Sequence, residues 1–370
     1  MTTGAKSSKA RRVKESLLLE MTEQRIPIGA RLPSESELMM QFAVSRTTVR
    51  QALAELSSEG FVAKQQGRGT FRVSPAERRR RGGRSMLVGV WFNWPSGPLY
   101  GPMLDGIRGE LAHWGYHAVL EGGLETGAER EGIRSLIRKG LDGFIVSPSS
   151  DPSDSHEPII EILEQGVPLV LIDKRLPGCE ADLVTTNSRL GTEQLVSHLL
   201  GLGHRRIGFI GTANVSTVEE RLQGYRLTLQ KHGLAVDPAW TRISDEVYAD
   251  HGRQAAHELL SLPSDRRPTA VFGANDPIAE TVADVARGLG MQIPEDLSVV
   301  GFDAAGFDLE EPGWLTTYAQ PKYRIGQQAT QLLMCRIHNP APHIQTVLLD
   351  GELVLGGSTA PPRGFAGCGS

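Results

Sequence analysis

Cysteine is scarce in this sequence, and long apolar runs are absent. The 370 residues include three cysteines, Cys179, Cys335 and Cys368, which lie far apart and are odd in number. This pattern argues against a disulfide framework or a zinc site, and it suits a reducing compartment. No stretch approaches the roughly 18 apolar residues of a membrane span, and residues 1–20 lack a secretory signal. We therefore expect a cytoplasmic protein that binds no membrane.

The common signatures of catalysis are missing as well. The chain has no phosphate-binding Gly-rich loop with Lys and Ser or Thr, no Gly-x-Ser-x-Gly elbow and no His-Glu-x-x-His. Arg206 stands where the third glycine of a dinucleotide fingerprint would be, and the ten histidines show no metal-ligand spacing. These absences argue against an enzyme, a cofactor or a metal site.

Charge is distributed unevenly along a chain of ordinary composition. Apolar residues make up 39% and charged residues 22%, and the length suggests two or three domains. Residues 1–84 carry 17 Lys and Arg against 8 Asp and Glu, a net charge of +9, whereas the remainder carries −13. The boundary is a segment with Pro, paired Gly and four consecutive Arg, which we interpret as a linker over residues 75–85. A basic domain on an acidic body is typical of proteins that bind nucleic acid.

The basic segment predicts three helices. Apolar residues recur at helical spacing over about residues 10–24, which predicts a first helix with one buried face. Ser34 and Glu37 form a capping-box pattern at the start of a second helix. Ser45 is placed to cap a third helix that ends near Gly60.

The third helix is followed by a predicted two-stranded wing. Residues 61–66 and 70–73 read as short strands joined by a turn at Gly67-Arg68-Gly69. On the third helix, the side chains opposite or beside the apolar face are Arg46, Thr47, Thr48, Arg50 and Gln51. Arg and Thr suit the edges and phosphates of a DNA major groove, and an Arg at a wing tip suits a minor groove.

This segment closely resembles the winged-helix DNA-binding domain of the GntR family of bacterial regulators over about residues 10–74. The matching motifs are Arg31-Leu-Pro-Ser-Glu35, Val44-Ser-Arg-Thr-Thr-Val-Arg50, Glu59-Gly-Phe and Gln66-Gly-Arg-Gly-Thr70. The resemblance implies DNA contacts from the third helix and the wing, and the cap of the second helix is a further candidate. The candidates are Ser34, Arg46, Thr47, Thr48, Arg50, Gln66, Gly67 and Arg68. The chain has Ser36 where the family often has a basic residue.

The acidic remainder alternates short apolar runs with amphipathic stretches. The expected strands are residues 86–91, 143–146, 168–173, 206–211, 270–273 and 299–303. The expected helices include residues 103–114, 191–201 and 276–289. Such alternation predicts an α/β fold with parallel sheets, whose ligands bind beyond the carboxyl ends of the strands. The polar residues there are Asp173 with Lys174 and Arg175, Asn275 with Asp276, and Asp303, although these groups also serve as helix caps and structural ion pairs.

Residues 86–362 resemble the effector domain of the LacI/GalR family, which is itself similar to periplasmic sugar-binding proteins. The most specific motifs are residues 139–145, 198–211, 220–225 and 294–303. The resemblance implies two lobes joined by crossovers near residues 182–187, 315–320 and 345–349. It also implies effector contacts at Asp173, Arg221, Asn275, Asp276, Asp303 and Gln320, and Arg175 is a further candidate from the strand-end pattern. Trp94, Tyr100 and Trp314 are candidates for an aromatic wall against a sugar.

Together these patterns predict a winged helix-turn-helix at residues 1–74, a linker at 75–85, a two-lobed effector domain at 86–362 and a flexible tail at 363–370. The architecture resembles arabinose-responsive transcriptional repressors. We expect a homodimer that represses transcription by binding a pseudo-palindromic operator, and we expect a small-molecule effector of the carbohydrate class to control it from between the lobes. The alternatives are a carbohydrate-active enzyme or a sugar receptor tethered to DNA, and a head that binds only protein.

Overall fold

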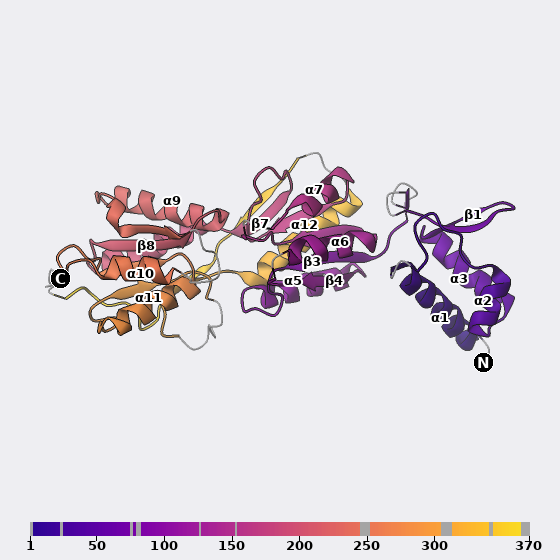
Figure 1. Ribbon diagram of the computed structural model, residues 1–370, viewed down its shortest axis with the longest axis horizontal. Helices are drawn as coiled ribbons and strands as arrows, with labels where there is room; N and C mark the ends of the chain where they lie inside the picture. The colour runs from indigo at the N-terminus through magenta and orange to yellow at the C-terminus, as the bar shows by residue number, and fades with distance from the viewer. Residues whose placement is uncertain are drawn as a thin grey trace.

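The computed structural model of the chain describes residues 3–22, 25–74, 77–78, 83–125, 127–151, 154–244, 252–304, 313–339 and 343–363. The expected tail, apart from Arg363, and part of the expected linker lie outside the described residues. Figure 1 shows three bodies in a row, which we call the head (residues 3–74), lobe 1 and lobe 2.

The head is a winged helix-turn-helix, as the sequence predicts. It contains α1 (Thr3–Thr22), α2 (Glu35–Phe42), α3 (Arg46–Ser58) and the antiparallel strands β1 (Val62–Gln65) and β2 (Gly69–Arg72). Its core joins the apolar faces of the three helices, and the fully buried side chains include Val13, Leu17, Leu38, Val49 and Leu56. Helix α1 begins seven residues before the expected start, because its polar first turns carry no apolar stripe by which a helix is recognised.

Lobe 1 is built on a parallel six-stranded sheet in the order β13-β7-β6-β5-β3-β4. Its strands are β3 (Leu87–Phe92), β4 (His117–Gly122), β5 (Gly143–Val146), β6 (Leu169–Ile172), β7 (Asp182–Thr186) and β13 (Thr346–Leu349). Helices α5 (Tyr100–His113) and α12 (Lys322–His338) contribute to one core cluster, and α6 (Ala128–Arg138) and α7 (Glu157–Glu164) contribute to another. Alternate strand residues enter the two clusters, so the sheet is buried on both faces.

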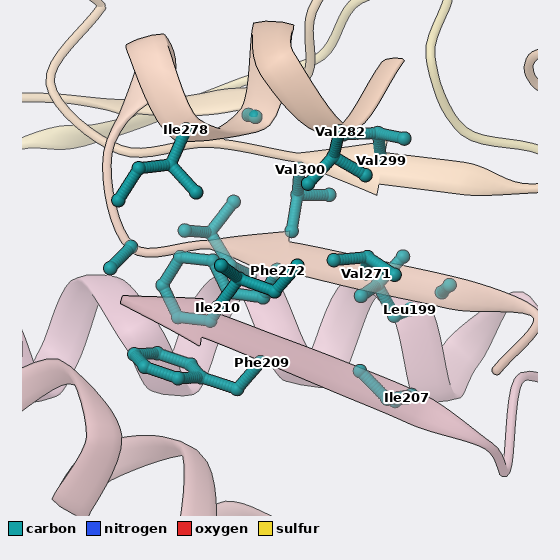
Figure 2. Packing of buried hydrophobic residues seen from close by; sticks show 14 of the residues in the cluster. Leu199, Ile207, Phe209, Ile210, Val271, Phe272, Ile278, Val282, Val299 and Val300 are labelled. Atoms are coloured by element: carbon teal, nitrogen blue, oxygen red, sulfur yellow. The ribbon is translucent and has the colours of Figure 1, made fainter. Parts of the chain in front are cut away.

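Lobe 2 is built on a parallel four-stranded sheet in the order β11-β10-β8-β9. Its strands are β8 (Ile207–Thr212), β9 (Thr241–Ser244), β10 (Ala270–Gly273) and β11 (Ser298–Val300). Its helices are α8 (Ser188–Gly201), α9 (Ser216–Lys231), α10 (Arg253–Leu260) and α11 (Asp276–Gly288), with a short 3-10 turn at Pro238–Trp240. Figure 2 shows the core between the sheet and its helices, where the Phe209 and Phe272 rings meet edge to face with centroids 5.2 Å apart.

The chain passes between the lobes at three places. Strand β7 of lobe 1 leads into α8 of lobe 2, β12 (Thr317–Ala319) leads into α12 of lobe 1, and β13 leads into β14 (Glu352–Val354). Strands β12 and β14 pair with each other in antiparallel fashion. Thr316, just before β12, bridges to Val300 of β11, and Ala319 of β12 bridges to Asp303. The expected α/β fold with two lobes and parallel sheets is therefore confirmed.

Candidate functional site

Helix α3 presents its polar face to solvent beside the turn that follows α2. The Ser45 hydroxyl caps the helix by accepting a hydrogen bond from the Thr48 amide at 3.3 Å. Arg46, Thr47 and Arg50 are exposed. The Arg50 Nε donates to both carboxylate oxygens of Glu35, at 3.1 and 3.0 Å, which holds the guanidinium across the gap between α3 and α2.

Thr48 differs from its neighbours on α3. Its side chain is only 6% exposed, and its hydroxyl lies 2.9 Å from that of Ser45. The expected DNA contact through the Thr48 side chain therefore has little surface available, because the hydroxyl belongs to the helix cap. Ser34 is also a cap: it completes a capping box with Glu37 at the start of α2.

The wing tip is exposed and built on glycines. Gln66, Gly67 and Arg68 are solvent-exposed. The flanking strands pair in a register in which Val62 lies opposite Arg72 and Gln65 lies opposite Gly69. Gly67 has φ +73° and Gly69 has φ +114°, values that side chains with a Cβ rarely adopt. The tight turn places Arg68 at the tip, where it is free of the burial that restrains Thr48.

The lobe 1 half of the second candidate site is centred on Asp173. This residue directly follows β6 and has φ +65°, a left-handed conformation that is strained for a residue other than glycine. Its carboxylate accepts a hydrogen bond from the Tyr100 hydroxyl at 3.2 Å, and the same hydroxyl lies 3.1 Å from that of Ser147. The Tyr100 ring stacks on Phe92 at 4.9 Å, so Tyr100 is a wall fixed by both its ring and its hydroxyl.

The lobe 2 half is centred on Arg221 of α9. Its guanidinium donates to Asp303 Oδ1 at 3.0 Å and to the carbonyl of Ala274 at 2.6 Å. It also lies over the Phe302 ring, 3.7 Å from the centroid. The same Asp303 oxygen accepts from Gln320 Nε2 at 2.6 Å, so the arginine and the amide converge on one carboxylate.

The two halves face each other across the lobe boundary. Burial raises the pKa of Asp303, Arg221 lowers it, and the carboxylate of Asp173 raises it again from the opposite lobe. The Thr186 hydroxyl donates to Gln320 at 2.5 Å, and the backbone N–H of Arg175 donates to the Ser216 hydroxyl at 2.9 Å. The residues that meet here are Tyr100, Asp173, Arg221, Asp303 and Gln320, which we call the interlobe site; each is between 3% and 8% exposed.

Four other candidates lie apart from this arrangement or serve it differently. The Asn275 side chain caps α11 by accepting from the Ile278 amide, and the Arg175 side chain is exposed. Trp314 packs with Arg287 in the last turn of α11, whereas the interlobe site lies near the first turn, so Trp314 is not the expected wall. Trp94 is 51% exposed.

Asp276 is a buried neighbour of the interlobe site. It is 1% exposed and accepts a hydrogen bond from the Thr317 hydroxyl at 2.6 Å. That bond ties the start of α11 to β12, one of the segments that connect the lobes. The carboxylate thus has a structural partner in this conformation.

Sequence reasoning missed two groups at the site. Phe302 supplies the ring under Arg221, and Lys322 donates to the carbonyl of Ala304 at 2.6 Å. Burial lowers the pKa of Lys322, while Asp303 and Asp276 raise it. Both residues lie close in sequence to Asp303 or Gln320, and that proximity could have marked them as site residues. A phenylalanine at the end of a strand is more readily interpreted as part of the core. Lys174, noted only as a neighbour of Asp173, is buried and donates to Ser150 at 3.0 Å.

Within the described ranges, His, Cys, Asp and Glu form no group of three or more that could hold a metal ion. No helix in that part of the chain is long and apolar enough to span a bilayer.

The geometry defines a class of protein: a winged-helix DNA-binding head on a two-lobed body that encloses a polar site. Residues 9–71 match the family described as bacterial regulatory proteins, gntR family, and residues 196–359 match the periplasmic binding protein-like domain.

Individual proteins match over much longer stretches. The chain is 30% identical to the arabinose metabolism transcriptional repressor of Geobacillus stearothermophilus over 353 residues, which cover 94% of this chain and 96% of the relative. A LacI family transcriptional regulator from Enterococcus faecium with bound ribose superposes with a TM-score of 0.62, at 28% identity over 74% of this chain and 99% of that one. A complex of the transcriptional regulator CelR with cellobiose superposes with a TM-score of 0.65. The two are 25% identical, and the match covers 85% of this chain and 91% of that one.

The chain therefore belongs to the family of transcriptional repressors that join a GntR-type head to a LacI-like, periplasmic-binding-protein-like effector domain. The relatives are regulators rather than enzymes, in agreement with the absence of catalytic signatures.

Proposed function

We propose that the protein is a homodimeric repressor that binds a pseudo-palindromic operator and responds to a neutral, polyhydroxylated sugar at the interlobe site. In each protomer α3 enters a major groove, with Arg46, Thr47 and Arg50 facing bases and phosphates, and Arg68 of the wing approaches a minor groove. The observation that supports the DNA half is the exposure of these four side chains on one head. In the cell we place the protein in the bacterial cytoplasm, on the nucleoid when it is bound to its operator.

The charge balance of the interlobe site favours a neutral ligand. Asp173 and Asp303 contribute two carboxylates from opposite lobes; burial is the main cause of the raised pKa of Asp303, Arg221 opposes it, and Asp173 raises it further. Three nearby cations already have partners: Arg221 has Asp303 and the Ala274 carbonyl, Lys322 has the Ala304 carbonyl, and Lys174 has the Ser150 hydroxyl. Hydroxyl groups donate readily to carboxylates, whereas a phosphate or an acid would add a negative charge to the two already present. The names of the relatives support the same class, since they refer to arabinose, ribose and cellobiose.

A paired thermal-shift screen tests the effector. Purified full-length protein is heated with L-arabinose, D-ribose and cellobiose, each beside an anionic counterpart such as L-arabinonate or ribose 5-phosphate. A ligand at about 100 times its Kd adds about 2.7 kcal/mol to the stability of the state that binds it, enough for a shift of several degrees. We expect at least one neutral sugar to shift the transition while its anionic counterpart does not. A shift by the anionic members alone contradicts the charge argument.

DNA binding is tested on a duplex selected from a random library with the wild-type protein. Arg46→Ala should weaken binding about 5- to 150-fold, the range for one base or phosphate contact of about 1–3 kcal/mol. Arg130→Ala, an equal change of charge at an exposed position of α6 on lobe 1, is the matched control. Sedimentation of the complex gives its stoichiometry. Equal affinity of the Arg46 and Arg130 variants, or one protomer per duplex, argues against the proposal.

A further inference from the structure

One arginine of the linker is buried although its sequence predicts solvent exposure. Arg78 begins a run of four arginines, yet it is only 3% exposed. Its backbone N–H donates to the Ser74 carbonyl at 2.8 Å, and its own carbonyl accepts from the Gly83 N–H at 3.0 Å. The two described ends of the linker are therefore held together at Arg78. In Figure 1 the linker lies between the head and lobe 1.

On its lobe 1 side, Arg78 is bound by the loop between α6 and β5. The guanidinium donates to the carbonyl of Gly140 and lies 3.3 Å from the carboxylate of Asp142, which is 4% exposed. Asp142 also accepts from the backbone amides of Ser85 at 2.8 Å and Met86 at 3.0 Å, immediately before β3. The carboxylate is thus fixed to the sheet, and a rotation of lobe 1 carries it along.

On its head side, Arg78 contacts the turn that leads from α3 into the wing. Its guanidinium lies 4.5 Å from the centroid of the Phe61 ring, a cation–π distance, and Phe61 packs on the head core. The linker backbone is equally close, because a Cβ on Gly83 would lie 2.5 Å from the Glu59 carbonyl oxygen. The turn at residues 59–61 directly follows α3, so any force on it acts on the proposed recognition helix.

We propose that Arg78 is a positioning residue that fixes the head on lobe 1, and that it passes lobe movement to α3. A guanidinium is suited to this task, because it donates in fixed directions to the lobe 1 loop while its flat face stacks on the head ring. The contact itself follows from the geometry alone. Its use in regulation rests on the proposed function, together with a movement of the lobes against each other when the effector binds.

The contact is tested by electron–electron distance measurement on the full-length dimer. Spin labels are attached at Met40→Cys on α2 and Arg130→Cys on α6, both exposed, in a background with the three native cysteines replaced by serine. Dilution with unlabelled protein isolates distances within one protomer. Arg78→Gln removes the guanidinium. Arg84→Gln is the matched control, since the Arg84 side chain contacts His338 and the Ile337 carbonyl, both at the end of α12 in lobe 1.

We expect a narrow distance distribution in the parent protein and in Arg84→Gln, and one of about twice that width or more in Arg78→Gln. Gly83→Ala leaves every charge in place but forces the linker away from Glu59, so it should broaden the distribution as well. Circular dichroism checks that each variant is folded; if Arg78→Gln is not, Gly83→Ala decides alone. A broad distribution in the parent, or no broadening in a folded variant, overturns the proposal.

A DNA measurement tests the use of this contact. On the selected duplex, insertion of two base pairs between half-sites should weaken the parent and Arg84→Gln at least about tenfold, because fixed heads reach only one spacing. Arg78→Gln should tolerate the insertion to within about threefold, while its affinity for a single half-site stays unchanged. An unchanged spacing profile would refute the positioning role. Loss of half-site binding in the parent would instead refute the proposed function, and the distance measurement would still decide whether Arg78 holds the head.

Discussion

Removal of the Arg221 side chain should destabilise the effector domain strongly at high pH and weakly at low pH. Arg221 and Asp303 form a buried ion pair, with side chains 4% and 10% exposed. In Arg221→Met the aliphatic volume is largely kept, but Asp303 loses its cation and retains Gln320 as a hydrogen-bond donor. Breaking a buried pair by removal of one partner costs about 3–5 kcal/mol. At about 2–4 °C per kcal/mol for a domain of this size, the Tm should fall by roughly 10 °C.

The pH dependence follows from the direction of the Asp303 pKa. Burial and Asp173 already raise this pKa above its ordinary value, and Arg221 is the first group that lowers it. Without Arg221 the folded-state pKa rises further, so the folded variant binds a proton more tightly than the unfolded chain does. Its stability is therefore greatest below the unfolded pKa and is lost as the pH rises through the folded pKa. As the pH falls from 8 toward the ordinary pKa of a carboxyl, the cost should decrease, with a remainder of about 1–2 kcal/mol from the Ala274 carbonyl left without its donor.

Urea unfolding followed by circular dichroism at pH 8 and pH 5 measures this difference. Arg226→Met, the same replacement at an exposed position of the same helix, is the matched control and should change stability little at either pH. A loss for Arg221→Met that is the same at both pH values would refute the reasoning, because it would mean that Asp303 does not titrate in the variant. A loss below about 1 kcal/mol at pH 8 would show that the pair is not buried in solution.

Two further changes test the packing of lobe 1 and the role of the wing. Gly326→Ala places a Cβ onto the backbone carbonyl of Met103 where α5 and α12 cross, so it should cost about 1–3 kcal/mol in thermal unfolding. The control Gly101→Ala places a Cβ in open space on α5 and should not destabilise the protein. Equal stability of the two variants would contradict the close crossing. Arg68→Ala should weaken binding to the selected duplex and lower the magnitude of the slope of log affinity against log salt concentration by about one, as measured by fluorescence anisotropy. An unchanged slope would mean that the wing tip does not contact the DNA.

The head was predictable from sequence because its signals are local. The capping box of Ser34 and Glu37, the Ser45 cap and the apolar spacing of α3 each act within a few residues, and the structure forms each of them. Thr48 shows where local reasoning ends. Helical geometry placed it at the edge of the polar face, but whether its hydroxyl faces solvent or the cap depends on a rotamer that spacing does not determine.

The effector domain was predictable in its strands and less so in its site. Central strands such as β5 and β10 are continuous apolar runs and appear at the expected bounds. Edge strands β4 and β9 were not foreseen, because their half-exposed, partly polar sequences lack that signal. Trp314 and Asn275 have side chains suited to a sugar site, but Trp314 packs with Arg287 at the far end of α11 and Asn275 caps the start of that helix. Their placement is decided by packing between elements distant in sequence, which no local pattern records.

The interlobe site and the linker suggest how one effector can act on a distant helix. The carboxylates of Asp173 and Asp303 come from opposite lobes, and Asp173 adds to the raised pKa of Asp303, which is due mainly to burial and is opposed by Arg221. We propose that a neutral ligand that donates hydroxyls to both carboxylates joins the two lobes, so that its affinity is greater for the closed arrangement. Only such a difference in affinity can move an equilibrium between lobe arrangements. Asp142 is fixed to the lobe 1 sheet and holds Arg78. On the proposed function, the same movement would therefore reach the turn after α3, and a sugar that never touches DNA would change the direction in which the head points.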